Sequence, residues 1–168
     1  YFFNLKFIKN IFMKIILMGN QLFGESTLKK FHEETTHDVV AVYCMPDEKN
    51  KSIDPVKNYA LNNDIPLFQP SNFKEQRVLD QLKSHDADLC VMSYVTIFLP
   101  EIARNIPKYG SICFHPSLLP LHRGPSSINW PIINGESKTG LTIFYPNNNL
   151  DQGDILLQKE VIIGPDDT

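Results

Sequence analysis

A histidine and an aspartate in the second half of the chain are the side chains whose surroundings best suit acid–base chemistry. His115 ends an apolar run and precedes Pro116, which favours an extended conformation for the histidine and directs the chain out of a sheet. Its imidazole can gain or lose a proton near neutral pH. Asp151 lies in the polar segment NNNLDQGD, between two apolar runs. Both residues suit general acid–base catalysis, and both also suit a structural role in which backbone groups satisfy them.

Metal-binding and nucleotide-binding patterns fit these positions poorly. His122 lies close to His115 in sequence, but no third ligand follows at a suitable spacing, so we expect no zinc site. Asp151 and Asp154 could be two carboxylates of a calcium loop, but the other positions and the terminal glutamate of such a loop are missing. The segment GNQLFGE, which starts at Gly19, matches neither the dinucleotide fingerprint nor the P-loop. We therefore expect neither a metal nor a nucleotide cofactor. The N–H groups after Gly19 either form a tight turn or meet a substrate anion.

The elements that must position these residues alternate along the first part of the chain. Strands are predicted at residues 14–19, 38–45, 65–69, 87–93 and 110–115, and helices at residues 22–34, 54–62, 72–84 and 100–106. This alternation predicts a parallel sheet with right-handed crossovers. The predicted fold class is therefore α/β, with a doubly wound, Rossmann-like and mostly parallel sheet.

The segment after Pro116 has a different pattern, in which a proline-rich loop leads into a helix at residues 127–135. Two more strands, at residues 140–145 and 154–163, then flank a polar loop. In open α/β sheets the ligand crevice lies outside the carboxyl ends of the strands. Four loops are therefore candidate walls of a site: those at Gly19, Ser93, His115 and Asp151.

Composition and charge are typical of one globular domain. The chain has 168 residues, of which 42% are hydrophobic and 21% charged, and its formal net charge is −3. Because Lys and Arg form no long run, strong nucleic-acid binding by this segment alone is not expected, and RNA contact through a missing part stays open. Three cysteines without a C-x-x-C pair, and without a secretory signal, predict reduced thiols and a cytoplasmic setting.

The two ends of the chain carry expectations of their own. We expect residues 1–12 to be an upstream, non-structural extension, because Met13 opens a clean first strand; an amphipathic arm is the alternative. This apolar segment is too short to span a bilayer and lacks a cleavage site, so we expect no membrane anchor. Because no closing helix follows the last apolar strand, we expect residues 13–168 to be one domain that is truncated at its C-terminus.

Residues 115–161 resemble the signature region of the folate-dependent formyltransferases, through the string HPSLLPLHRGPSSINWPIINGESKTGLTIFYPNNNLDQGDILLQKEV. The resemblance covers residues 13–168 and implies a doubly wound domain of the formyltransferase type, with 10-formyltetrahydrofolate as formyl donor. Several strings are most similar to the hydrolase domain that begins 10-formyltetrahydrofolate dehydrogenase: MGNQLFG, MPDEKNKSIDP, SSINW with LLQKEV, and PDDT. The implied enzyme releases tetrahydrofolate and passes the formyl group to water, or to a carrier arm on a downstream domain.

The resemblance also assigns catalytic roles. The family's asparagine, histidine and aspartate correspond to Cys113, His115 and Asp151, and the dehydrogenase's hydrolase domain likewise lacks the asparagine. The formyl carbonyl is then expected between His115 and Asp151, with His115 donating to the oxyanion and Asp151 orienting a water or accepting a proton. Cys113 is either a plain core residue or the site of a covalent formyl intermediate. The missing amide donor predicts a slower reaction that is directed to water or a thiol.

The same resemblance places the folate and leaves alternatives open. The pterin ring is expected in two loops, largely on backbone groups, at Val95, Ile97, Phe98, Asn147 and Asn148. Ordinary loop packing would also explain these side chains, and Arg123 is either an anion contact or a solvated surface residue. One alternative is the catalytic domain of methionyl-tRNA formyltransferase, which needs a basic tRNA-binding domain outside this segment. The other, from a different class, is a non-catalytic folate-binding fragment.

Overall fold

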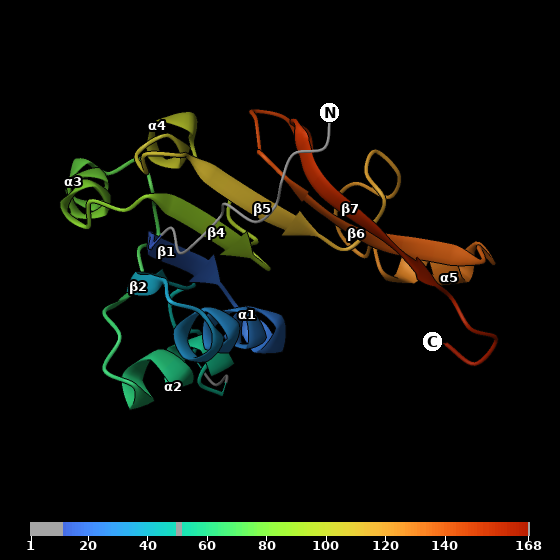
Figure 1. Ribbon diagram of the computed structural model, residues 1–168, viewed down its shortest axis with the longest axis horizontal. Coiled ribbons are helices and arrows are strands. Elements are labelled where there is room, and N and C mark those ends of the chain that lie inside the picture. Colours follow the sequence, from blue (N-terminus) through green and yellow to red (C-terminus); the bar gives the residue numbers. More distant parts are fainter. Residues whose placement is uncertain (1–11, 50–51, 168) are drawn as a thin grey trace.

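A seven-stranded, mostly parallel sheet forms the centre of the protein (Figure 1). The computed structural model describes residues 12–49 and 52–167, so the expectation for residues 1–11 lies outside the described residues. The strands are β1 (Lys14–Gly19), β2 (Asp38–Tyr43), β3 (Leu67–Phe68), β4 (Leu89–Ser93), β5 (Ser111–His115), β6 (Lys138–Phe144) and β7 (Ile155–Ile162). Their order is β3-β2-β1-β4-β5-β6-β7; the first five are parallel, and β6 and β7 are antiparallel additions at one edge. The predicted α/β, doubly wound class is confirmed.

Helices cover both faces of the parallel part of this sheet, whereas β7 is exposed along its length (Figure 1). Successive residues of a strand point to opposite sides, so each parallel strand can pack against both helix layers. The helices are α1 (Gln21–Glu34), α2 (Pro55–Asn62), α3 (Gln76–Ser84), α4 (Glu101–Arg104) and α5 (Asn129–Ile133). In β1, Leu17 belongs to the cluster that packs under α1 and α2, whereas Ile16 and Met18 belong to the cluster under α3 and α4 (Figure 1). None of the described helices has the length and apolar character needed to cross a membrane.

One aspartate fixes the start of two helices at the ligand-facing end of the sheet. Asp54 is the N-cap of α2, as its position before Pro55 predicts: its Oδ1 accepts the backbone N–H of Val56 at 2.9 Å. Its Oδ2 accepts the backbone N–H of Gln21 at 2.9 Å, at the first turn of α1. The carboxylate thus satisfies backbone donors of both helices, and it lies where an anion would be most strongly attracted to the start of α1.

Element boundaries differ from the predicted ones where local hydrogen bonds intervene. The helix predicted at 72–84 begins at Gln76, because the Asn72 side chain accepts the N–H of Lys74 and holds a turn before it. The helix predicted at 100–106 is a single turn, Glu101–Arg104. Strand β6 begins earlier than predicted, at Lys138, because β7 pairs with it along its whole length.

Candidate active site

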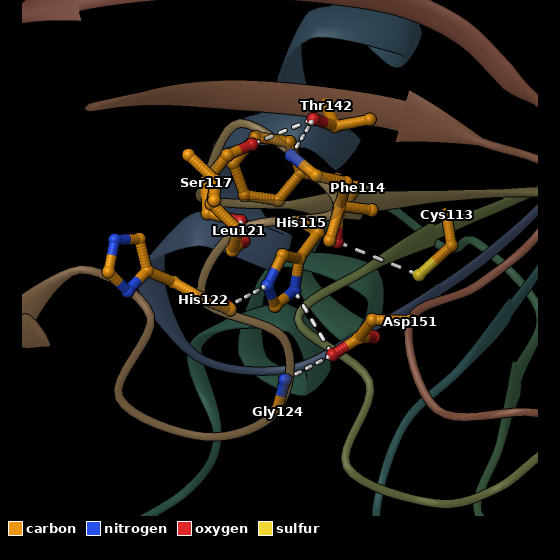
Figure 2. Close-up of polar contacts among 10 residues, drawn as sticks. Cys113, Phe114, His115, Ser117, Leu121, His122, Gly124, Thr142 and Asp151 are labelled. Carbon is orange, nitrogen blue, oxygen red and sulfur yellow. Dashed lines mark hydrogen bonds and ion pairs between the residues drawn. The ribbon is translucent and has the colours of Figure 1, made fainter. Parts of the chain in front are cut away.

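His115 is the last residue of β5, at the carboxyl end of the parallel strands, and it is 6% exposed. Its Nε2 lies 2.9 Å from the backbone carbonyl of His122 (Figure 2). Because a carbonyl oxygen only accepts, Nε2 must carry the proton of this hydrogen bond. The other ring nitrogen, Nδ1, is therefore the atom left to exchange a proton or a hydrogen-bond partner during a reaction.

Asp151 meets that free nitrogen from the loop between β6 and β7. Its Oδ2 lies 3.5 Å from Nδ1 of His115, and the same oxygen accepts the backbone N–H of Gly124 at 2.7 Å (Figure 2). The distance to His115 exceeds that of an ordinary N–H···O hydrogen bond, which is about 2.7–3.2 Å. The structure thus brings together the histidine and aspartate that are 36 residues apart in sequence, without locking one onto the other.

The backbone of the β6–β7 loop leaves Asp151 little freedom. Asp151 itself has a φ of +46°, and Gly153 has a φ of +131°. A Cβ added at Gly153 would lie 1.8 Å from the carbonyl oxygen of Tyr145, so only glycine fits there. Two backbone hydrogen bonds close the base of the loop: Tyr145 N to Asp154 O at 2.9 Å, and Asn147 N to Gln152 O at 3.0 Å.

The loop that follows β5 holds the carbonyl to which His115 donates. The His122 ring pairs with Glu136, with Nε2 at 2.9 Å from Oε1, and the residue has a φ of +51°. This hydrogen bond to His122, with a further one from Asn134, lowers the pKa of Glu136. Glu136 therefore fixes the residue whose backbone oxygen orients the ring of His115.

Buried hydroxyl groups support the same loop from β6. Thr142, which pairs with His115 in the β5–β6 ladder, is fully buried and donates its hydroxyl proton to the carbonyl of Ser117 at 2.7 Å. The Ser117 hydroxyl in turn donates to the carbonyl of Leu121 at 2.7 Å (Figure 2). One of these hydrogen bonds thus attaches the segment after Pro116 to β6, and the other closes a turn within that segment.

Cys113 lies two residues before His115 on β5. Burial, with a smaller contribution from the nearby charge of Asp151, raises the pKa of its thiol to about 12. The thiol is consequently protonated at neutral pH, and its Sγ donates a hydrogen bond to the carbonyl of Phe114 at 3.6 Å. A protonated thiol is a weak hydrogen-bond donor and a poor nucleophile.

A cleft of about 200 Å³ lies beside Cys113 and Asp151. Its walls include four of the side chains predicted to meet the pterin, namely Val95, Ile97, Phe98 and Asn147, together with Cys113 and Asp151. Asn148 differs, because its side chain is turned to the guanidinium of Arg104 and the carboxylate of Glu101. Arg123 is exposed and makes no polar contact with any described residue. Asp151 therefore contacts His115 and also lines the cleft.

Comparison with known proteins identifies the chain. The family model described as formyl transferase matches residues 13–168. The chain belongs to the formyl transferase family. The chain is 40% identical over 161 residues to a methionyl-tRNA formyltransferase of Fusobacterium nucleatum, covering 93% of the chain and 51% of that protein. It is also 40% identical over 161 residues to the cytosolic 10-formyltetrahydrofolate dehydrogenase of Mus musculus, covering 93% of the chain but 18% of that protein.

Solved structures share the fold of this chain. A phosphoribosylglycinamide formyltransferase from Bacillus halodurans superposes with a TM-score of 0.77 at 20% identity, over 92% of this chain and 82% of that one. One from Anaplasma phagocytophilum superposes with a TM-score of 0.76 at 24% identity, over 94% and 76% of the two chains. The chain thus spans about half the length of the methionyl-tRNA formyltransferase and less than a fifth of the dehydrogenase.

Some residues that support the candidate site carry no signal in the sequence. Gly124 acts through its backbone N–H, which any residue other than proline could supply. Glu136 lies 21 residues from His115 in a polar segment and resembles a surface residue. Arg104 ends a short helix in sequence and yet is 5% exposed. Only the folded arrangement reveals these three residues.

Proposed function

We propose that this chain is the formyl-handling domain of an enzyme that uses 10-formyltetrahydrofolate, and that it releases tetrahydrofolate by passing the formyl group to water or to a carrier arm. The contact between Asp151 and His115, with Asp151 in the cleft wall, carries this proposal. Family membership supports formyl transfer in general. The equal identity to the dehydrogenase and to the methionyl-tRNA enzyme leaves the acceptor to be argued from the site.

In the proposed reaction the formyl carbon lies within reach of both side chains. A water oxygen attacks that carbon, and the electron pair of the C=O bond moves onto its oxygen. Protonated His115 donates its Nδ1–H to this oxyanion, while the Asp151 carboxylate accepts a proton from the attacking water. Collapse of the intermediate breaks the bond to N10 of the folate, and N10 takes up the proton that Asp151 accepted, which restores the carboxylate. The products are formate and tetrahydrofolate.

The observed hydrogen bonds suit these roles. The carbonyl of His122 keeps the ring of His115 in one orientation, so Nδ1 faces Asp151 and not the protein interior. Gly124 donates to the oxygen of Asp151 nearest the histidine, which leaves the second carboxylate oxygen available to a nucleophile. A site that holds both groups before substrate arrives needs little reorganisation during the reaction.

Cys113 bears on which molecule accepts the formyl group. Its protonated thiol stands where the resemblance implies an asparagine, so the site lacks a strong amide donor to the oxyanion. Loss of one such donor typically lowers the rate by about 10²–10³. A water- or thiol-directed reaction is consistent with that loss, and the raised thiol pKa disfavours a formyl intermediate on Cys113 itself.

Location and partners form part of the same proposal. Cys44, Cys90 and Cys113 are all unpaired, which supports a reducing, cytoplasmic setting. We propose a folate as the small-molecule partner, with a carrier or dehydrogenase region, or tRNA, contacting the chain through a C-terminal region.

A second candidate is the catalytic domain of methionyl-tRNA formyltransferase. The observation that favours it is the 40% identity to the Fusobacterium nucleatum enzyme, of which the chain covers 51%. In this case the amine of methionyl-tRNA replaces water as nucleophile, and Asp151 accepts the amine proton. The third candidate is a folate-binding module without turnover.

One assay separates the three candidates. The full protein is mixed with 10-formyltetrahydrofolate and only water or a small thiol, and tetrahydrofolate is followed by its absorbance. We expect turnover that falls by about 10²–10⁴ in His115→Asn and is unchanged in His32→Asn, a control histidine exposed on α1. Turnover that begins only when methionyl-tRNA is added would favour the second candidate. Binding of the folate without turnover under either condition would favour the third.

A further inference from the structure

A buried arginine joins two walls of the cleft. Arg104 ends α4 and is 5% exposed. Its Nη1 donates to the carbonyl of Leu99 at 2.7 Å, and its Nη2 donates to Oδ1 of Asn148 at 2.7 Å. The guanidinium also lies over the ring of Phe98, 5.7 Å from its centroid. Leu99 and Phe98 belong to the segment after β4, and Asn148 belongs to the Asp151 loop.

No carboxylate among residues 12–49 and 52–167 forms an ion pair with Arg104. Its hydrogen bonds run to a backbone carbonyl and to an amide, and its buried Nε has no partner among the described residues. Withdrawing a guanidinium from water carries a large desolvation penalty, which neutral acceptors offset only in part. An apolar side chain would fill the same wall without that penalty. The arginine is therefore better explained by the two segments that it joins than by its contribution to stability.

The side-chain amide of Asn148 is held at both of its polar atoms by the single turn of α4. Arg104, at the end of α4, donates to its Oδ1, while Glu101, at the start, accepts from its Nδ2 at 3.0 Å. Rotating the amide by half a turn would place its NH₂ group against the guanidinium, so the two partners fix one orientation. Asn148 precedes Asp151 by three residues in a loop whose base is already closed. Fixing Asn148 therefore restrains the position of the Asp151 carboxylate.

We propose that Arg104 is a positioning residue of the formyl-transfer site. Through Asn148 it holds the Asp151 loop against the segment after β4, and so keeps Asp151 at His115. This inference rests on the proposed function. Without the guanidinium the Asp151 loop separates from α4, and the carboxylate spends less time near His115. The chemical step slows, while the apolar part of the cleft still binds folate.

Kinetics test the inference with four variants of the connection and one control variant. We expect kcat to fall about 10- to 100-fold in Arg104→Met and in Asn148→Ala, with KM changed less than about threefold. The double variant should be no slower than the slower single variant, because both changes break the same connection. Arg104→Lys, which can reach one of the two acceptors, should recover part of the lost kcat. Arg77→Met is the matched control, because this arginine is exposed on α3 and pairs only with Glu75. Multiplicative losses in the double variant, or an effect on KM alone, would overturn the proposal.

Hydrogen exchange provides a readout that does not depend on turnover. In Arg104→Met the amides of Asn147 and Gly124, which bond to or through the Asp151 loop, should exchange about tenfold faster or more. Amides of β1 and β4 should keep the wild-type rate. Unchanged exchange in the loop, or faster exchange throughout the sheet, would refute a positioning role. If wild-type protein fails to turn over folate, the proposed function fails, but this comparison still decides whether Arg104 restrains the loop.

Discussion

One carboxylate oxygen of Asp151 lies between Nδ1 of His115, at 3.5 Å, and the backbone nitrogen of Gly124, at 2.7 Å. The hydrogen bond from Gly124 holds the Asp151 carboxylate whether or not Nδ1 of His115 contacts it. The Nδ1–H of protonated His115 can therefore donate to a substrate oxygen, without the ring turning, while the carboxylate stays in place. Two groups with separate supports suit a reaction in which one donates a proton and the other accepts one.

Replacing that carboxylate by an amide of equal size should stop proton acceptance and leave the fold intact. In Asp151→Asn the amide oxygen can still accept the N–H of Gly124, but the side chain no longer takes a proton. We expect kcat for tetrahydrofolate release to fall about 10²–10⁴-fold, with the unfolding temperature nearly unchanged. Asp154→Asn, an exposed carboxylate in the same loop, is the matched control and should behave as wild type. Near-normal turnover in Asp151→Asn would refute the role given to Asp151.

A substitution at Cys113 is expected to raise kcat. Cys113→Asn introduces an amide donor on β5, two residues from His115, where the thiol is protonated and donates weakly. If the amide reaches the oxyanion, kcat should rise, by up to about 10². Cys113→Ala should change kcat only a few-fold, because the thiol is not proposed to react. A collapse of activity in Cys113→Ala would instead indicate a covalent formyl-cysteine, which mass spectrometry of the protein mixed with substrate would detect.

The order of strands and helices could be predicted from the sequence because short apolar runs alternate with stretches of helical spacing, such as residues 22–34. The run at 110–115 and the helix at 22–34 lie within one residue of β5 and α1 at each end. The beginning of α3 was misplaced, because the side-chain turn at Asn72 competes with helix formation over a few residues. Such competition depends on single hydrogen bonds that periodicity does not register.

The site was predictable only in part, and for a physical reason. His115 and Asp151 were candidates because they lie beside predicted strand ends, and their catalytic roles followed only from the resemblance to the formyltransferases. The support of Glu136 for His122 was not recognisable, since it depends on backbone direction in an irregular loop. Nor was the burial of Arg104, because a charged residue at a helix end is ordinarily solvated. The type of a side chain indicates which chemistry it can perform, whereas the residues that hold it in place depend on tertiary packing.

Glu136 should influence turnover without touching substrate. Glu136→Gln removes the charge that pairs with the His122 ring, and the carbonyl of His122 is then held less firmly against Nε2 of His115. We expect kcat to fall by between a few-fold and about 100-fold, since small misplacements of a catalytic group are costly. Glu160→Gln, which loses only an exposed pair with Lys138, is the control. The idea fails if the two variants have the same kcat.

Asp54 should stabilise the protein through two caps at once. Asp54→Ala removes the acceptor for Val56 and the acceptor for Gln21, so the starts of α2 and α1 both lose a partner. One lost cap costs about 0.5–2 kcal/mol, and we expect a total of about 1–4 kcal/mol in urea unfolding. Asp54→Asn keeps one oxygen acceptor and should lose about half as much. Equal losses in the two variants would show that charge, not the number of acceptors, supports the helix starts.

The three thiols should make the protein sensitive to alkali. Burial raises the pKa of Cys44, Cys90 and Cys113 from 9.0 to about 12. Above pH 9.0 the unfolded chain therefore loses these protons before the folded chain does. Their stabilising contribution is complete below the unfolded pKa and is lost as pH rises toward the folded pKa of about 12.

The size of this effect is measured as the change in the free energy of unfolding per pH unit. Each thiol lowers the free energy of unfolding by up to about 1.4 kcal/mol per pH unit across that window. Urea unfolding at a series of pH values measures the slope, and Cys90→Ala, which removes a thiol that is 1% exposed, should reduce it by the share of one proton. Because the cavity left by the substitution destabilises the protein equally at every pH, only the slope is diagnostic. A slope that Cys90→Ala leaves unchanged would mean that this thiol ionises equally easily in the folded and unfolded states.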